Sequence, residues 1–426
     1  MARFISLVAL AASLCAQAQD YTSWFTGNAD DAAPPPLGGT CMMGGASEFD
    51  PAMQWFLGRA NGGDVLVLRA SGADGYNDYM YYDLGGVNSV ETIRFNNAAA
   101  SNDPYVAQRI QKAEAIWFAG GDQWNYVDFW RNTPVMGLIN AAISERHIAI
   151  GGTSAGMAIL GGCYFSAQYG SITSAEALAD PFGPLMAVDC TPFLDVPFMA
   201  RTITDTHYDN PDRRGRHFTF LARMVQQGDS TAFGIACNEY VAVCVTPEGM
   251  AKVYGEWPDY EEYAWFMRVN CASPVGPEVC GPGLPLTWDR QAMAVNVYKV
   301  PATPNGANWL DLDDHLSGQG GTWEDWSAVA GDFATVAGEQ PPCGPTTLID
   351  EWHLEPLLQW DAGTRRALVR ALVPGSVVQL VAADGRVLER GRGDAAGQCQ
   401  LTVPMNGMVV LRALGTKGYR TWKLVR

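Results

Sequence analysis

The sequence predicts an α/β protein, with a parallel sheet that carries helices on both faces and a small C-terminal antiparallel β-sandwich. Short apolar runs ended by glycine alternate with stretches of helical periodicity between residues 38 and 300. Such β-α alternation is typical of parallel sheets. After residue 346, period-two alternation and the Asp384-Gly385 turn signal favour hairpins instead.

The α/β part has its expected elements in regular order. We expect strands at 40–43, 65–68, 90–95, 115–119, 147–150, 231–236, 240–246, 251–254 and 293–300, and helices at 50–57, 104–112, 127–130, 135–144 and 217–226. Residues 257–290 are interpreted as a surface insertion. Binding sites in parallel sheets lie beyond the carboxyl ends of the strands. Gly44, Ser71, Gly121 and Ser154 occupy that position in the predicted sheet.

The N-terminus has the pattern of a secretory signal. Residues 1–18 combine Arg3, an apolar stretch at 4–14 and an Ala16-Gln17-Ala18 cleavage pattern. The protein is therefore expected to pass the periplasm and to be secreted or held at the cell surface. Residues 19–37 are interpreted as a leader of the mature chain and 301–345 as a linker, so the units are 38–300 and 346–426.

Composition narrows the class of partner. The chain has 426 residues, 48% of them hydrophobic, which suits a globular protein with large cores. Its net charge of −17 argues against nucleic acid or an anionic membrane as partner and favours a neutral or cationic substrate. No apolar run after the signal is long enough to span a membrane.

Nine cysteines remain once the predicted signal is removed. Export makes disulfides possible, and Cys271 with Cys280, which enclose a Pro/Gly-rich loop, is the pair we expect. An odd number leaves at least one thiol free or paired between molecules. No Cys-x-x-Cys and no His pair at ligand spacing occurs, so we do not expect a zinc site.

A candidate nucleophile lies where a short strand changes into a helix. The β-branched run at 147–150 is stopped by Gly151 and Gly152, and helical spacing begins after Ser154. A sharp strand-to-helix turn between glycines presents its central residue over the end of the sheet, as in the nucleophile elbow of hydrolases. A plain glycine-rich turn and a phosphate cradle are the alternatives for this stretch.

Several motifs together resemble the peptidase S51 family, a group that includes the cyanophycinases and the aspartyl dipeptidase E enzymes. The motifs are Gly152-Thr-Ser-Ala-Gly156, Phe118-Ala-Gly-Gly-Asp-Gln123, Thr204-Asp-Thr-His207 and Arg213-Arg-Gly-Arg216, with support from Met43-Gly-Gly45, Arg69-Ala-Ser71 and Gly234-Ile-Ala-Cys-Asn-Glu239. The resemblance covers roughly residues 38–255. It implies a serine hydrolase on a sheet like that of class I glutamine amidotransferases, with Ser154 as nucleophile and His207 as base.

The remaining roles are hypotheses on this background. A triad needs a carboxylate that orients the base, and Glu176 is the expected one, with Asp180 and Asp205 as alternatives. The N–H groups of Ala155 and Gly121 are expected to form the oxyanion hole. The expected substrate-binding residues are Asp122, Gln123, Arg213 and Glu239.

We therefore predict a secreted serine hydrolase that cleaves a peptide or isopeptide amide, β-aspartyl or Asp-containing, through a Ser-His-Glu triad and an acyl-enzyme. We expect this reaction to need no metal and no cofactor. An amidase or esterase with a non-peptide substrate and a catalytically inactive binding protein of the same fold are the alternatives. The tail that ends in Lys423-Leu-Val-Arg426 resembles sorting domains of the type IX secretion system, which makes the secretion machinery a possible partner. A homodimer is a second possible assembly.

Overall fold

The computed structural model describes residues 19–228, 231–271 and 275–343, together with the C-terminal strands given below, Asp394 and Gln398. The predicted signal peptide at 1–18 lies outside the described residues.

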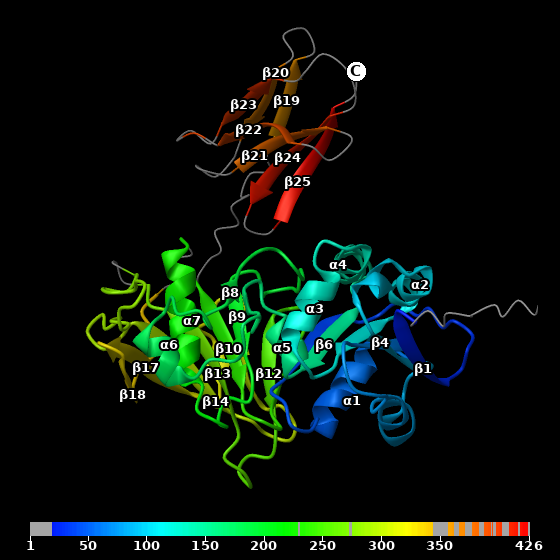
Figure 1. Ribbon diagram of the computed structural model, residues 1–426, viewed down its shortest axis with the longest axis horizontal. Helices are drawn as coiled ribbons and strands as arrows, with labels where there is room; N and C mark the ends of the chain where they lie inside the picture. Colours follow the sequence, from blue (N-terminus) through cyan, green and yellow to red (C-terminus); the bar gives the residue numbers. More distant parts are fainter. Residues whose placement is uncertain are drawn as a thin grey trace, which may run out of the picture.

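The first sheet has ten strands in the order β1-β4-β3-β5-β6-β2-β11-β12-β15-β16 (Figure 1). Their bounds are Tyr21–Gly27 (β1), Gly39–Met43 (β2), Asp64–Arg69 (β3), Ser89–Phe95 (β4), Ala115–Phe118 (β5), Ala149–Thr153 (β6), Ala242–Val245 (β11), Met250–Tyr254 (β12), Asn308–Asp311 (β15) and Gly318–Gln319 (β16). The central strands from β4 to β2 are parallel. Both flanks are antiparallel. The predicted α/β class is thus confirmed, although the sheet is mixed rather than wholly parallel.

Helices cover both faces of this sheet. Helix α1 (Asp50–Arg59) and the π-helix η1 (Tyr79–Leu84) pack on one face. The other face carries α2 (Pro104–Lys112), α3 (Gln123–Trp130), α4 (Pro134–Arg146) and the 3₁₀ helix η2 (Ala98–Asn102). Strand β3 shows why both faces are apolar, because Leu66 and Leu68 enter one core and Val65 and Val67 the other.

The interpretation of residues 19–37 as an unfolded leader is wrong for its first part. Tyr21–Gly27 forms β1, which pairs antiparallel with β4 over its whole length. The aromatic and β-branched residues of this run suit an edge strand. The Asp-, Ala- and Pro-rich residues that follow it concealed that signal in the sequence.

A second sheet has the order β18-β17-β14-β13-β10-β9. Its strands are Thr202–Asp205 (β9), Phe233–Cys237 (β10), Tyr263–Val269 (β13), Val295–Pro301 (β14), Thr322–Val329 (β17) and Asp332–Ala337 (β18). Only β9 and β10 pair in parallel. Helices α6 (Ser174–Ala179) and α7 (Arg214–Gln226) cover one face. Strands β7 (Tyr164–Phe165) and β8 (Val188–Asp189) form a separate antiparallel pair, and Cys163 before β7 forms a β-bridge with Ile203 of β9.

Residues 301–345 are not a linker with little regular structure, and the α/β part does not close near residue 300. Strands β15 and β16 extend the first sheet, and β17 and β18 extend the second. Trp326 in β17 is fully buried. The Gly, Pro and Asp residues of this stretch serve as turns between short strands, which hid the periodicity.

The C-terminal part forms two antiparallel sheets, as predicted. Their orders are β19-β20-β23 and β22-β21-β24-β25. The bounds are Leu357–Asp361 (β19), Arg366–Arg370 (β20), Val377–Ala382 (β21), Val387–Arg392 (β22), Cys399–Thr402 (β23), Val409–Gly415 (β24) and Gly418–Leu424 (β25). The expected Asp384-Gly385 turn lies outside the described residues.

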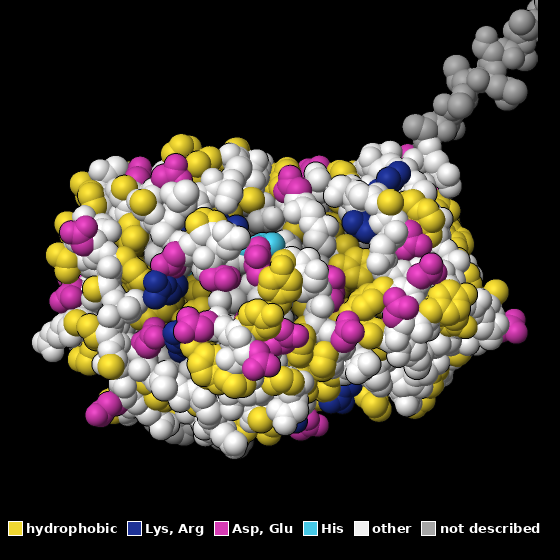
Figure 2. Space-filling model, turned by 90° about the horizontal axis from the view of Figure 1, so that it is seen from below, with side chains coloured by type: hydrophobic (Ala, Val, Ile, Leu, Met, Phe, Trp, Pro, Cys, Tyr) yellow, Lys and Arg dark blue, Asp and Glu magenta, His cyan; other side chains and the backbone are white. Residues whose placement is uncertain are grey.

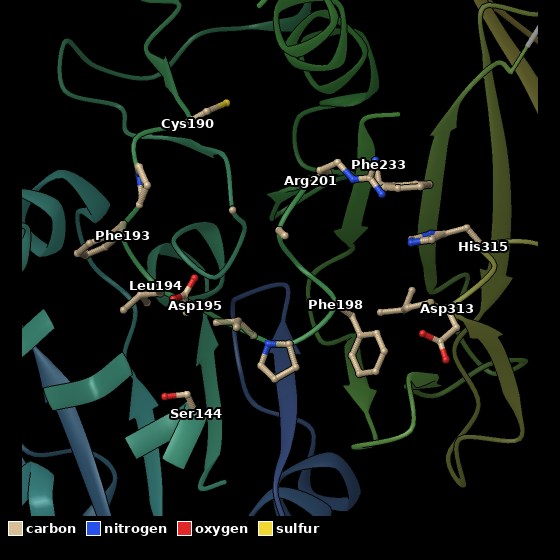
Figure 3. Close-up of a pocket in the computed structure, with 16 residues that line it drawn as sticks. Ser144, Cys190, Phe193, Leu194, Asp195, Phe198, Arg201, Phe233, Asp313 and His315 are labelled. Carbon is tan, nitrogen blue, oxygen red and sulfur yellow. The ribbon is translucent and has the colours of Figure 1, made fainter. Parts of the chain in front are cut away.

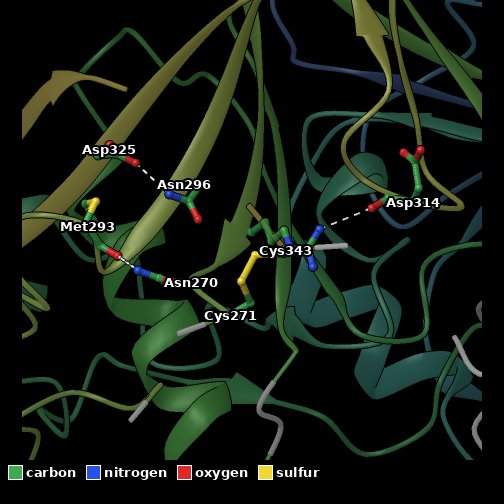
Figure 4. Close-up of a disulfide and its surroundings, with 8 residues drawn as sticks. Asn270, Cys271, Met293, Asn296, Asp314, Asp325 and Cys343 are labelled. Atoms are coloured by element: carbon green, nitrogen blue, oxygen red, sulfur yellow. Dashed lines mark hydrogen bonds between the residues drawn. A yellow bond between two sulfur atoms is a disulfide. The ribbon is translucent and has the colours of Figure 1, made fainter. Parts of the chain in front are cut away.

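Two disulfides form in the described part of the chain, Cys163–Cys190 and Cys271–Cys343. The expected pairing of Cys271 with Cys280 is therefore wrong. Cys280 packs toward the core under α7, whereas Cys271 follows the end of β13, where Figure 4 shows its bond to Cys343. The disulfide ties the second sheet to the chain after β18.

Candidate active site

Ser154 lies in a strained turn between β6 and α5 (Ala155–Ala158). Its φ of 52° and ψ of −115° are unusual for a residue with a Cβ. The predicted glycines allow this turn to pack closely. A Cβ on Gly152 would lie 2.6 Å from the Gly156 carbonyl carbon, and one on Gly156 would lie 2.1 Å from Phe118 O. The turn has the geometry of a nucleophile elbow.

His207 and Glu239 meet Ser154 at this edge of the sheets. Ser154 Oγ lies 2.8 Å from His207 Nε2, and His207 Nδ1 lies 2.6 Å from Glu239 Oε1. His207 follows β9 by two residues and Glu239 follows β10 by two, and these strands are parallel neighbours. The side chains of His207 and Glu239 are 24% and 22% exposed, so a substrate can reach the site.

The end of β2 holds the segments of all three residues in place. Met43 O accepts a hydrogen bond from Ser154 N (3.0 Å), Gly44 O from His207 N (2.8 Å) and Gly45 O from Tyr240 N (3.1 Å). Gly45 has a φ of +122°, and a Cβ there would lie 2.3 Å from His207 Cε1. Only glycine leaves room for the imidazole, which explains the Met43-Gly-Gly45 motif.

Glu176 is not the partner of His207. Its Oε2 accepts hydrogen bonds from Thr173 N (2.9 Å) and Thr173 Oγ1 (2.7 Å) in a capping box that starts α6. These bonds, from the backbone first, lower the pKa of the Glu176 carboxyl. The Thr-x-x-Glu spacing is the sequence signature of such a cap. Glu176 is therefore a structural residue, and its assignment to the triad is corrected.

The two alternative carboxylates are also engaged elsewhere. Asp180 Oδ1 accepts hydrogen bonds from Phe182 N (3.0 Å) and Gly283 N (2.9 Å). Asp205 is buried and forms a bidentate pair with Arg216, at 2.8 Å to Nε and 2.5 Å to Nη2. Burial alone would raise the pKa of Asp205, but the charge of Arg216 outweighs it and lowers that pKa.

Glu239 was expected in the substrate pocket and instead contacts the imidazole. The signal that could have identified it was its position relative to its strand. In a parallel sheet, the residues that follow two neighbouring strands lie side by side. The pairing of β9 with β10, however, was not evident from the sequence.

The groups expected to form an oxyanion hole lie beside Ser154. Ala155 N–H is the first of α5 and so has no carbonyl within the helix to bond. A Cβ on Gly120 would lie 3.6 Å from Ser154 Cβ, which places the turn with Gly121 next to the serine. Tyr126 Oη donates to Ala119 O (2.7 Å) and holds this turn.

The other expected substrate-binding residues lie around the site, and each of them already forms a hydrogen bond within the protein. Asp122 Oδ1 caps α3 by accepting from Trp124 N (2.9 Å). Gln123 Nε2 donates to Phe165 O (3.4 Å). Arg213 Nη1 donates to Thr206 O (2.8 Å) and lies 4.0 Å from Asp205 Oδ1. Arg213, at 20% side-chain exposure, has further guanidinium donors for which the described residues supply no hydrogen-bond acceptor, so they can bind an anionic group.

The described residues contain no cluster of His, Cys, Asp and Glu that could hold a metal ion. No helix among them is long and apolar enough to cross a membrane. Figure 2 shows acidic side chains scattered over one face with few basic ones between them, which agrees with the net charge of −17.

The fold and this geometry define an α/β domain with a Ser-His-Glu arrangement at the carboxyl ends of its strands. Residues 41–250 match the family model of peptidase family S51. This domain belongs to that family, which confirms the resemblance of its motifs.

Cyanophycinases are among the similar proteins. Those of Synechococcus elongatus and Trichormus variabilis are 24% and 23% identical over 208 and 210 residues, or 47% and 48% of this chain. The alignments cover 59% and 65% of the relatives, so the chain spans less than two thirds of their length. A solved peptidase from an acI-B1 Actinobacterium is 13% identical, with a TM-score of 0.40 over 66% of this chain and 98% of that one.

Proposed function

We propose that this protein is a serine peptidase that hydrolyses a peptide or isopeptide amide through an acyl-enzyme on Ser154. The continuous hydrogen-bonded path from Ser154 Oγ through His207 to Glu239, with distances of 2.8 Å and 2.6 Å, supports the proposal. A serine hydroxyl becomes a nucleophile only when a base within hydrogen-bond reach removes its proton.

The reaction proceeds in two halves. Ser154 Oγ attacks the carbonyl carbon while its proton passes to His207 Nε2, and the oxyanion accepts hydrogen bonds from the N–H groups of Ala155 and Gly121. The imidazolium then protonates the leaving amine, and the amine departs. In the second half, His207 deprotonates a water molecule, which attacks the ester carbon and releases Ser154.

The proposed substrate carries an aspartyl residue in β- or α-linkage. Similarity to cyanophycinases supports this class, as does Arg213, a partly exposed cation in the loop after His207 that suits a substrate carboxylate. The acidic surface suits a substrate that also carries a cationic side chain.

We also propose that the chain is exported, with residues 1–18 as signal peptide and the C-terminal strands as a sorting domain for the secretion machinery. Cleavage after Ala18 would leave Gln19 and Asp20, directly before β1, at the new N-terminus. Mass spectrometry of the protein recovered from the culture medium tests this. A chain that begins at Met1 and stays inside the cell would contradict it.

The activity is tested with the full mature chain. A fluorophosphonate probe should label wild type at Ser154 and leave Ser154→Ala unlabelled, and Ser154→Ala should lose at least about 10³-fold in kcat/KM. Turnover of β-aspartyl dipeptides, α-aspartyl dipeptides and simple esters identifies the preferred bond. Ester turnover alone would favour an esterase, and a wild-type protein that neither reacts with the probe nor turns over any substrate would be a binding protein.

A further inference from the structure

A cavity of about 550 Å³ lies at the end of the sheets opposite to the candidate active site. It is bounded by Arg201 and Phe233, which stand at the amino ends of β9 and β10, whereas His207 and Glu239 follow the carboxyl ends of the same strands. Strands of this length separate the two sites by roughly 15 Å. The cavity is therefore not a part of the triad's own substrate cleft.

The walls of this cavity are mostly apolar. They include Phe193, Leu194, Val196, Phe198, Phe233 and Leu312. Its volume falls within the usual range of small-molecule pockets, roughly 300–1,000 Å³. Such walls favour a ligand with an apolar body.

His315 supplies an unpartnered polar group on one wall. The residue is 6% exposed, and its ring stacks on Phe233 with centroids 3.7 Å apart. Within the part of the chain that the structure describes, its imidazole forms no hydrogen bond. Figure 3 shows the ring nitrogens of His315 turned toward the cavity. These nitrogens are not among the fully buried atoms, so a ligand in the cavity can form a hydrogen bond with them.

Arg201 adds a positive charge beside it. Its guanidinium donates to Thr231 Oγ1 and lies 6.0 Å from the Phe233 ring centroid. Among the described residues it has no carboxylate partner. Figure 3 shows it beside Phe233, on the same wall as His315. The guanidinium thus keeps donors for an anion.

The charge state of His315 fits this arrangement. Burial first, and then the charges of Arg268 and Arg201, lower its pKa to about 3, although the charge of Asp314 opposes the shift. The imidazole is therefore neutral at pH 7 and offers one N–H donor and one acceptor. Asp195 and Asp313, the acidic residues of the lining, are exposed. They disfavour a ligand with a second negative charge at the mouth.

We propose that this cavity binds a small molecule or chain end with an apolar body and a single carboxylate, held by Arg201 and His315. The carboxylate belongs either to a free apolar acid or to the C-terminal residue of a peptide. In both cases Arg201 forms a charge-assisted hydrogen bond and His315 donates a second one. This site is independent of the Ser154 chemistry.

The test compares an acid with its uncharged isostere by calorimetric titration of the full mature chain. Wild type should bind 4-phenylbutyrate at least tenfold more tightly than 4-phenylbutyramide. Arg201→Gln should lower the affinity for the acid at least tenfold and change that for the amide less than twofold. His315→Phe should weaken binding of the acid about threefold or more. The control Arg59→Gln changes a partly buried arginine of α1 outside the cavity and should bind both as wild type does.

A peptide arm identifies the source of the carboxylate. The Ser154→Ala protein, which does not turn over peptides in our mechanism, is titrated with Gly-Gly-Phe and with its C-terminal amide. Tighter binding of the free peptide than of phenylbutyrate assigns a peptide end, and the reverse assigns a free acid. Equal affinity of wild type for acid and amide would overturn the proposal, whether or not the variants fold. So would an Arg201→Gln protein that binds the acid like wild type.

Discussion

At the scale of single residues, the contact between Glu239 Oε1 and His207 Nδ1 fixes which imidazole nitrogen faces Ser154. A carboxylate accepts hydrogen bonds, so Nδ1 carries the proton and Nε2 is left to accept the Ser154 proton. In the proposed reaction, the carboxylate also stabilises the imidazolium that forms during attack. Glu239 therefore acts on the reaction through His207.

We expect Glu239→Gln to lower kcat/KM by about 10²–10⁴-fold, because an amide that donates to Nδ1 stabilises the wrong tautomer. Labelling of Ser154 by a fluorophosphonate probe should slow in parallel. Both are measured with the best substrate of the panel above, across pH 5–9.

Glu176→Gln is the matched control. Glutamine can also close a capping box, so activity should stay within twofold of wild type. If Glu176→Gln were the more damaging change, the assignment of Glu239 would be refuted.

The two glutamates also show how far the sequence specified the site. Ser154, His207 and the glycines beside them were predictable because each has a local signature, a turn between strand and helix or a family motif. Glu239 ends a supporting family motif, but its role at His207 depends on the pairing of β10 with β9, which that motif does not contain. Glu176 carries a local signature, but of a helix cap.

At the scale of elements, β9 and α7 are joined by the buried pair of Asp205 and Arg216. The two side chains are 4% and 5% exposed. Asp205 ends β9, two residues before His207, and Arg216 lies in the first turn of α7. Arg216 also donates to Ile172 O (3.2 Å), so the pair fixes the start of the His207 loop against two neighbouring segments.

We expect Asp205→Asn to lower the free energy of unfolding by about 3–5 kcal/mol, since it leaves the Arg216 charge buried without a partner. Chemical denaturation at pH 7 measures the change. The Asp212–Arg214 pair is the exposed counterpart, with 53% and 37% side-chain exposure. Asp212→Asn should therefore cost less than about 1 kcal/mol. Equal costs for the two variants would show that the buried pair has no special role.

Elements differed in how well the sequence predicted them. The central strands β3 and β5 are buried on both faces, so they read as continuous apolar runs, Val65 to Leu68 and Ala115 to Phe118. Strands β15, β16 and β18 are short, partly exposed and separated by turn residues, so neither length nor periodicity marked them. Edge strands get their stability from the neighbour they pair with, which a local pattern does not contain.

At the scale of the whole molecule, two buried histidines make stability depend on pH. His217 is fully buried under the second sheet, and its Nε2 lies 3.1 Å from Ile203 O. Burial lowers its pKa to about 4 from an ordinary 6.5, although Asp205 opposes the shift. His315 is shifted in the same direction. Both are neutral in the folded protein at pH 5, where an exposed histidine binds a proton.

The sign of the effect follows from proton binding. Between pH 6.5 and about 4 the unfolded chain binds more protons at residue 217 than the folded one. The contribution of neutral His217 is thus fully present above pH 6.5 and is lost as the pH falls toward 4. The loss is at most about 1.4 kcal/mol per pH unit for each such histidine.

We expect His217→Gln to destabilise the protein at pH 7 but to lose much of that disadvantage at pH 5, since glutamine keeps a donor for Ile203 O and takes up no proton. The difference in unfolding free energy between wild type and variant should shrink by about 1–2 kcal/mol, as measured by urea denaturation at both pH values. His147→Gln, which changes an exposed histidine, is measured beside it as the control. A His217→Gln difference that is constant or grows on acidification would show that folded His217 takes up a proton as readily as the unfolded chain does.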